Sequence, residues 1–225
     1  MNYQAIDCLG VVLAGGLSSR MGQDKAQLTR LKNVTTTTNN SAIKSTSSML
    51  DFSKQLLSDA GIKNIVVSGD NYQIPDLVPC SGPVGGIYSV LAHYPEHLQP
   101  KALLILPVDL PLMTAADLAK LRLKGELSHK ATFFSDGQKQ AHHIPLYLPN
   151  NAFLQLFLAQ AFQRESLLAL GNEKSKRSGQ KNNKNGPSVR ALLAKMPHQA
   201  ITSPNNQALF NTNTPEQWQQ AKKQF

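Results

Sequence analysis

Cysteine is scarce in this chain, and long apolar runs are absent. Only two of the 225 residues are cysteines, Cys8 and Cys80, and their spacing fits neither a zinc knuckle nor a Cys-x-x-Cys redox pair. We interpret both as reduced, structural cysteines. No apolar stretch reaches the roughly 18 residues of a membrane span, and the N-terminus lacks the basic and then apolar pattern of a secretory signal. A soluble, cytoplasmic protein is therefore expected.

Acidic residues are also few. The 14 Asp and Glu against 23 Lys and Arg give a net charge of +9, which favours anionic partners such as nucleotides or nucleic acids. Many of the positive charges lie between residues 172 and 186, mixed with Asn, Ser and Gly and without interleaved aromatic residues. Such a composition is typical of a solvated loop. We therefore expect no nucleic-acid partner; steep salt dependence of DNA or RNA binding would indicate the opposite.

Continuous aliphatic runs indicate an α/β fold. Residues 9–13 and 102–106 have the composition of strands buried on both faces, and a third strand is expected at 62–68. Helices are expected between them, one from a cap at Ser45 or Ser47 to Gly61 and one over 82–91. This alternation predicts a single three-layer domain with a mostly parallel, Rossmann-like sheet that binds ligands at the carboxyl ends of its strands.

The second half of the chain has less regular patterns. The expected elements are strands at 131–134, 144–148 and 209–212 and helices at 151–163, 188–196 and 215–224. Two polar segments of low complexity, near 32–47 and 172–186, are expected to be flexible insertions in one domain that spans residues 1–225.

The segment after the first strand has the properties of a phosphate-binding loop. Gly15 and Gly16 allow backbone N–H groups to approach an anion closely, and Arg20 and Lys25 bring positive charge to the same rim. The spacing matches neither the dinucleotide fingerprint G-x-G-x-x-G nor a Walker loop. The pattern therefore predicts a different kind of phosphate-binding loop for a nucleotide triphosphate.

A carboxylate follows the central strand directly. Asp109 lies between Pro107 and Pro111, which stiffen the turn, at the edge of the sheet where ligands are expected. Mg²⁺ commonly binds one or two carboxylates together with substrate phosphates, so Asp109 is a candidate magnesium ligand. The alternative is that Asp109 caps the helix expected to begin near Thr114.

Four motifs together resemble one enzyme family. Residues 13–25 fill every fixed position of L-A-G-G-x-S-x-R-M-G-x-D-K, which is the signature of the molybdenum cofactor guanylyltransferases within the nucleotidyltransferase superfamily. Residues 82–86 resemble the family's G-P-L-x-G segment, 186–190 (G-P-S-V-R) a family helix start that carries Ser and Arg, and 210–216 (F-N-T-N-T-P-E) a family element that ends in N-x-N-T-P-E. The chain departs from the pattern after Lys25, where residues 31–48 replace a compact turn, and in the lysine-rich segment before Gly186.

The resemblance implies a role for individual residues. Lys25, Arg20 and Asp109 would act in catalysis, with Mg²⁺ on Asp109. The nucleotide would be bound by Leu13, Ala14, Gly15, Gly16, Lys25, Asp76, Gly82, Gly85 and Asp109. Molybdopterin would be bound by Arg190, Asn211 and Asn213. If residues 209–212 continue as a strand, the two Asn point to the same side, either as pterin ligands or as a second oxygen contact for the metal. Alternatively, they form a turn while Thr214 caps the last helix.

The implied reaction transfers GMP from GTP to molybdenum-loaded molybdopterin and releases pyrophosphate. Alternatives are the same chemistry with another base or acceptor, as in molybdenum cofactor cytidylyltransferases and sugar-phosphate nucleotidyltransferases, or a GTP-binding protein that delivers the cofactor without catalysis. The implied partners are GTP, molybdopterin and, in transient contacts, molybdenum-insertion proteins and apo-molybdoenzymes. A monomer without a membrane partner is expected.

Overall fold

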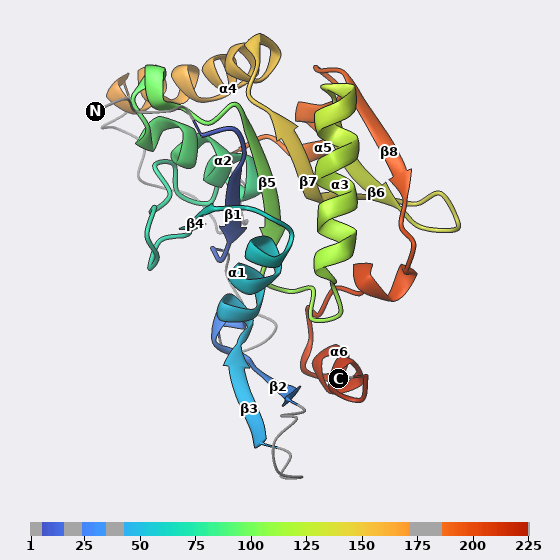
Figure 1. Ribbon diagram of the computed structural model, residues 1–225. Coiled ribbons are helices and arrows are strands. Elements are labelled where there is room, and N and C mark those ends of the chain that lie inside the picture. Colours follow the sequence, from blue (N-terminus) through green and yellow to red (C-terminus); the bar gives the residue numbers. More distant parts are fainter. Residues whose placement is uncertain (1–5, 16–23, 35–42, 172–185, 225) are drawn as a thin grey trace, which may run out of the picture.

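The computed structural model describes residues 6–15, 24–34, 43–171 and 186–224 (Figure 1). The aliphatic runs form the middle of a six-stranded sheet with the order β4-β1-β5-β7-β6-β8. Its strands are β1 (Leu9–Leu13), β4 (Asn64–Ser68), β5 (Ala102–Pro107), β6 (Ala131–Ser135), β7 (Ala141–Pro149) and β8 (His198–Thr202). Only β7 runs against the others. The predicted α/β class with a mostly parallel sheet is confirmed.

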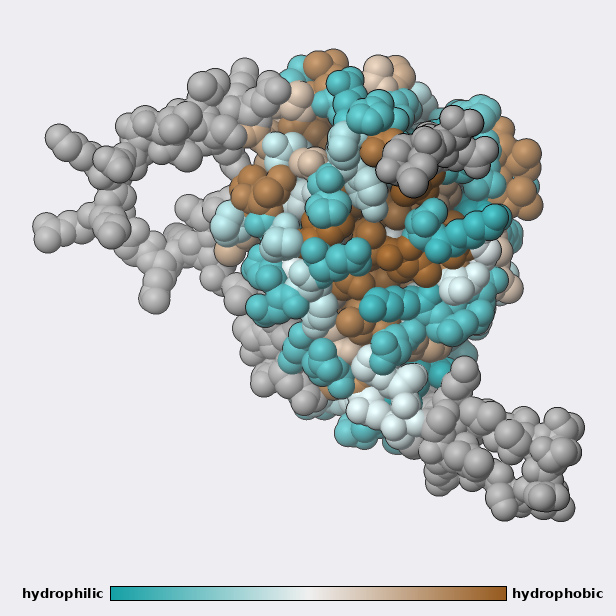
Figure 2. All heavy atoms as spheres, turned by 60° about the vertical axis from the view of Figure 1, so that its left-hand side comes forward, coloured by the Kyte–Doolittle hydropathy of each residue, from teal (hydrophilic) through white to brown (hydrophobic). Residues whose placement is uncertain are grey.

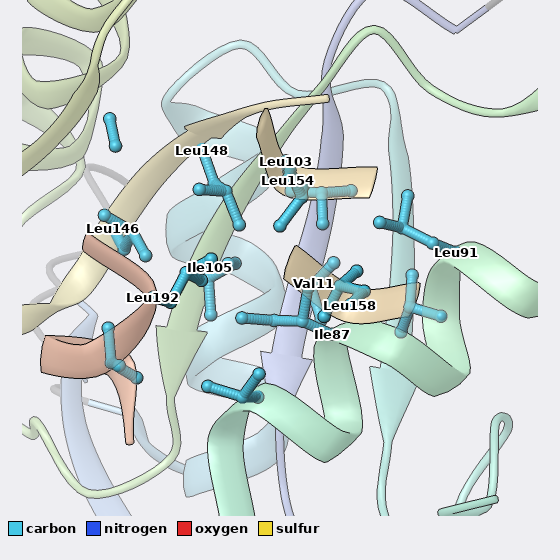
Figure 3. Close-up of a cluster of buried hydrophobic side chains, with 14 of the residues drawn as sticks. Val11, Ile87, Leu91, Leu103, Ile105, Leu146, Leu148, Leu154, Leu158 and Leu192 are labelled. Carbon is cyan, nitrogen blue, oxygen red and sulfur yellow. The ribbon is translucent and has the colours of Figure 1, made fainter. Parts of the chain in front are cut away.

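Helices cover both faces of this sheet and make it the middle of three layers. One face packs against α2 (Gly82–His93), α4 (Ala152–Gly171) and α5 (Val189–Leu193), and Figure 3 shows this core around Val11 and Ile105. The other face packs against α1 (Met49–Asp59) and α3 (Ala115–Ser128) through Val12, Leu104 and Leu106. Because successive strand residues point to opposite faces, a continuous aliphatic run fills both cores.

A β-hairpin occupies part of the polar stretch in which no strand was expected. Strand β2 (Thr29–Val34) pairs antiparallel with β3 (Ile43–Ser48). Low sequence complexity concealed the high β-propensity of the Thr, Val and Ile residues in this stretch. The hairpin leads directly into α1, which is capped by the Ser48 side chain rather than by Ser45 or Ser47. Segment 172–185, the main part of the other expected insertion, lies outside the described residues.

The prediction of a strand at 209–212 is wrong. Residues 206–209 form the short helix η3 (Asn206–Leu209), and the chain then runs unpaired to α6 (Pro215–Lys222). Thr212 instead donates its backbone N–H to the carbonyl oxygen of Asp109 at 2.9 Å, so a loop contact replaces strand pairing. Strand β8 was missed because it is a short edge strand of mixed polarity, none of whose five residues is fully buried.

Two further short helices lie in connections: η1 (Lys25–Gln27) and η2 (Glu96–Leu98). The surface in Figure 2 carries apolar residues interleaved with hydrophilic ones. The large exposed apolar side chains in the described part are Leu77, Leu123, Leu127, Phe153 and Leu156. Within that part, no helix is both long and apolar enough to cross a membrane.

Candidate active site at the carboxyl ends of the strands

Three polar side chains from distant parts of the chain meet beyond strands β1 and β5. The Lys25 ammonium donates hydrogen bonds to Asp109 Oδ2 at 3.0 Å and to Asn213 Oδ1 at 2.6 Å. The side chains of Lys25 and Asp109 are only 17% and 15% exposed. Because water screens such a pair poorly, their attraction is stronger than that of an ion pair on the surface. We call Lys25, Asp109 and Asn213 the charge cluster.

The backbone around Asp109 is held from two sides. Val108 N–H donates to the carbonyl of Leu13, at the end of β1, and both the backbone N–H and the hydroxyl of Thr212 donate to the carbonyl of Asp109. Asp109 does not cap the following helix, because Thr114 does so by accepting from Asp117 N–H at 3.2 Å. The Asp109 carboxylate is therefore available for the charge cluster.

The second carboxylate oxygen of Asp109 is buried, and none of the described residues donates a hydrogen bond to it. Leaving a buried acceptor unsatisfied costs free energy, so such an atom in a cluster of polar residues marks a ligand position. A divalent cation with a preference for oxygen fits the position chemically. Within the described residues, no group of three or more His, Cys, Asp or Glu side chains could hold a metal. Substrate phosphates and water are the usual further ligands of such a cation.

Caps place the other two members of the charge cluster. Asp24 accepts the backbone N–H of Ala26 at 2.9 Å and so begins the η1 turn that carries Lys25. Asn213 precedes Thr214, which caps α6 in a capping box with Gln217. The Gln217 side chain also accepts the N–H of Asn213 at 2.7 Å. The expected alternatives therefore coexist: Thr214 caps the helix, while Asn213 joins the site.

A second cluster lies where β1, β4 and α2 meet. Gly15 and Gly69 approach so closely that a Cβ atom on Gly69 would lie 2.7 Å from the Gly15 nitrogen. A Cβ atom on Gly15 would lie 3.7 Å from Asp76 Oδ2, and one on Gly86 would lie 3.8 Å from Asp76 Oδ1. The Asp76 carboxylate thus lies between the start of the glycine loop and the first turns of α2.

The carboxyl group of Asp76 has a perturbed environment. Partial burial, and secondly the negative charge of Asp70, raise the pKa of Asp76 above its ordinary value. Among the described residues, none donates a hydrogen bond that would offset this effect. The charge of Asp76 does not stabilise the folded protein. A carboxyl group with such a perturbed pKa is a candidate for ligand binding.

The remaining predicted residues lie around these clusters or outside the described part. Leu13 ends β1, and Ala14 N–H donates to the carbonyl of Ser68. Gly82 begins α2, and Gly85 packs closely against the Ser81 side chain. Gly16 and Arg20 lie outside the described residues.

The predicted pterin residues separate into different places. Asn211 is exposed, and because residues 210–213 are not a strand, strand geometry does not align Asn211 with Asn213. Arg190 is exposed on α5, and its charge acts on His143 of β7. Burial, followed by the positive charges of Arg190, His198 and His142, lowers the pKa of His143. His143 therefore lies in an electropositive environment.

Several residues of the site were not anticipated. Tyr72 donates a hydrogen bond to Asp24 at 2.5 Å, and Thr212 and Gln217 hold the backbone beside Asp109 and Asn213. The spacing of Thr214 and Gln217 is a capping-box signal that could have identified Gln217. No local pattern identifies Tyr72, since its partner lies 48 positions away.

Comparisons with known proteins match this chain to one family. Residues 10–178 match the family described as the MobA-like NTP transferase domain. The chain is 33% identical over 214 residues to a molybdenum cofactor guanylyltransferase of Xanthomonas euvesicatoria pv. vesicatoria (strain 85-10), covering 93% of this chain and 91% of the relative.

Two solved structures share the fold. The structure of molybdopterin-guanine dinucleotide biosynthesis protein A from Archaeoglobus fulgidus superposes with a TM-score of 0.59 at 16% identity, covering 96% of this chain and 97% of that one. A Mycobacterium tuberculosis H37Rv protein in complex with manganese superposes with a TM-score of 0.53 at 13% identity, covering 98% and 100% of the two chains.

The environment of Asp76 predicts a conflict between stability and binding. Because the folded state raises the pKa of Asp76 above the ordinary value of 3.8, wild-type stability falls as the pH rises through the range that begins there. Asp76→Asn has no such charge. It should therefore increase the melting temperature at pH 7.5 but have little effect near pH 4, while weakening nucleotide binding. Thermal denaturation at both pH values tests this, and a lower melting temperature for Asp76→Asn at pH 7.5 would contradict it.

Proposed function

Because this chain belongs to the MobA-like NTP transferase family, we propose that it transfers GMP from GTP to molybdenum-loaded molybdopterin. The observation that carries the proposal is the charge cluster, which combines a shielded cation with a carboxylate oxygen to which no described residue donates a hydrogen bond. It lies at the edge of the sheet from which the glycine loop also extends. A nucleotide triphosphate bound by that loop would have its phosphates close to the Lys25 ammonium group.

The reaction needs little covalent chemistry from the protein. A phosphate oxygen of molybdopterin forms a bond to the α-phosphorus of GTP, while the bond from that phosphorus to the oxygen shared with the β-phosphorus breaks. Pyrophosphate leaves with the electron pair. Because the attacking phosphate is already ionised, no general base is required, and positioning with charge neutralisation supplies the rate enhancement.

Lys25 has the donors for this role. Its ammonium group has three N–H bonds, of which the described residues use two, on Asp109 and Asn213. The third can bind a phosphate oxygen while the first two hold the side chain in place. Lys25 thus neutralises negative charge on the triphosphate from a fixed position. We propose that Arg20 assists in this neutralisation.

We propose that Asp109 also holds Mg²⁺. Its oxygen Oδ1, which has no hydrogen-bond partner in the described part of the chain, would bind the cation while Oδ2 retains Lys25. When bound, the metal supplies further positive charge to the phosphates. Manganese in the related Mycobacterium tuberculosis structure is a divalent cation bound to that protein, and it supports the expectation of a divalent metal here.

The second cluster would bind the rest of the nucleotide. Asp76 offers acceptors to the sugar hydroxyls or to N–H groups of the base, and its pKa is raised by burial and by the charge of Asp70. The backbone from Leu13 to Gly16 and the start of α2, with Gly82 and Gly85, would surround the phosphates and the nucleoside. These contacts do not involve the charge cluster, so binding of the nucleoside and handling of the phosphates can be tested separately.

The acceptor would bind on the side of α5. A guanidinium group matches a phosphate well, and Arg190 contributes to the electropositive environment of His143. Asn211 and Asn213 complete the proposed molybdopterin site. The proposal also includes a cytoplasmic monomer that contacts molybdenum-insertion proteins and apo-molybdoenzymes transiently.

Pyrophosphate release with molybdenum-loaded molybdopterin, Mg²⁺ and either GTP or CTP tests the proposal. Release with GTP and not with CTP is expected. Release only with CTP would assign the chain to a cytidylyltransferase, and GTP binding without release would indicate a cofactor-delivery protein.

Asp109→Asn should reduce turnover by at least about a hundredfold, because it removes a negative charge from both the metal position and Lys25. The fold should persist, since the backbone contacts of Asp109 do not involve its side chain. Asp59→Asn is a control, because Asp59 is an exposed acid that accepts a hydrogen bond from Gln55. Near wild-type turnover of Asp109→Asn in saturating Mg²⁺ would remove Asp109 from the site.

Asn213→Ala and Asn211→Ala should differ in their effects on the nucleotide. Of these two asparagines, Asn213 is the one that contacts Lys25. Asn213→Ala should therefore raise the KM for GTP or lower kcat by at least about tenfold. Asn211→Ala should affect only the KM for molybdopterin. Steady-state kinetics with each substrate varied in turn separates these effects, and equal effects of both variants on GTP would contradict the assignment.

A further inference from the structure

The turn after β4 contacts residues on both sides of the glycine-loop motif. We call residues 69–72 the β4 clasp. On one side, Gly69 abuts the backbone of Gly15, with no room for a side chain, and its φ of +149° lies in the region that favours glycine. On the other side, the Tyr72 hydroxyl donates a hydrogen bond to Asp24 Oδ2 at 2.5 Å.

The β4 clasp is itself held firmly. Tyr72 N–H donates to the carbonyl of Gly69 at 2.9 Å, and Gly69 N–H donates to the carbonyl of Ile74 at 3.0 Å. Ile74 is 2% exposed and donates its own N–H to the carbonyl of Val67, inside strand β4. The position of the Tyr72 ring is therefore tied to the sheet rather than to a free loop.

A short path connects Tyr72 to the charge cluster. Asp24 accepts from Tyr72 with one carboxylate oxygen, and with the other it accepts the N–H of Ala26, which begins the turn that carries Lys25. Gln27, at the end of that turn, also forms a side-chain hydrogen bond with Tyr72. The Tyr72 hydroxyl thus forms hydrogen bonds with Asp24 and Gln27, which lie on either side of Lys25 in the sequence.

The phenol is suited to a permanent donor role. Burial, followed by the hydrogen bond with Asp24, raises the pKa of Tyr72 above its ordinary value of 10.0. The group therefore stays protonated at neutral pH and continues to donate to the Asp24 carboxyl group. A hydrogen bond to a charged acceptor is stronger than one between neutral groups.

From this geometry we infer that Tyr72 is a positioning residue for nucleotidyl transfer, which fixes Asp24 so that Lys25 meets the phosphates of a nucleotide held at Gly15. The inference rests on the phosphate-binding role of Lys25 in the proposed function. Tyr72 itself does not contact the charge cluster. Its effect is expected on nucleotide binding and not on acceptor binding.

Tyr72→Phe keeps the ring against Gly69 and removes only the hydroxyl. We expect the KM for the nucleotide to rise about fivefold, which corresponds to the net contribution of one hydrogen bond. The KM for molybdopterin should change little. Tyr94→Phe is the matched control, because it removes the hydroxyl of a partly buried tyrosine at the end of α2, away from this path.

A double-mutant cycle tests the route through Asp24. If Tyr72 acts through Asp24, Tyr72→Phe should add nothing to the nucleotide KM once Asp24→Ala is present. Full additivity of the two substitutions would overturn the inference, as would an unchanged nucleotide KM in Tyr72→Phe. A rise in the KM for molybdopterin equal to that for the nucleotide would overturn it too, because it would indicate a general structural effect.

Failure of the role of Tyr72 can be distinguished from failure of the proposed guanylyl transfer. If the wild-type protein releases pyrophosphate from CTP instead of GTP, the guanylyl proposal fails, and the same variants are compared with CTP. If the wild type releases none, Mg²⁺–GTP binding by calorimetry replaces KM. Weaker binding by Tyr72→Phe, but not by Tyr94→Phe, supports the role of Tyr72, and equal binding by all three proteins refutes it.

Discussion

The ion pair between Lys25 and Asp109 is the contact on which the site depends. Burying two charges has a desolvation cost, which their attraction offsets only when the geometry is good and further hydrogen bonds are made. Here the distance is 3.0 Å, and Asn213 supplies an additional acceptor for Lys25 at 2.6 Å. The pair therefore requires that strand β5, the turn after the glycine loop and the C-terminal segment all come together.

The fold meets this requirement by combining rigid and local supports. Strand β5 lies inside the sheet between two hydrophobic cores, so Asp109 extends from the most constrained part of the molecule. Lys25 and Asn213 are held by caps and by loop contacts. Trp218 of α6 packs with Leu28 and Met49, which keeps the C-terminal helix beside the η1 turn. The site also retains two unfavourable features that ligands can relieve: the Asp109 oxygen that lacks a partner among the described residues, and the raised pKa of Asp76.

The sequence predicted what depends on local pattern. Continuous aliphatic residues identified β1 and β5, and the structure places Asp109 just beyond the end of β5, as the sequence predicted. Strand β8 and the β2–β3 hairpin escaped prediction, because pairing with a distant or polar partner decides their conformation. The contact of Lys25 with Asn213 spans 188 positions, and that of Tyr72 with Asp24 spans 48. Such contacts become visible only in the folded chain.

The central claim is that Asp109 divides its two oxygens between Lys25 and a metal. The most direct measurement is a crystal structure with GTP and Mn²⁺, with diffraction data collected at the manganese absorption edge. We expect an anomalous peak within about 2.5 Å of Asp109 Oδ1, with Lys25 still hydrogen-bonded to Oδ2. A manganese ion bound elsewhere, with Oδ1 left without a ligand, would contradict it.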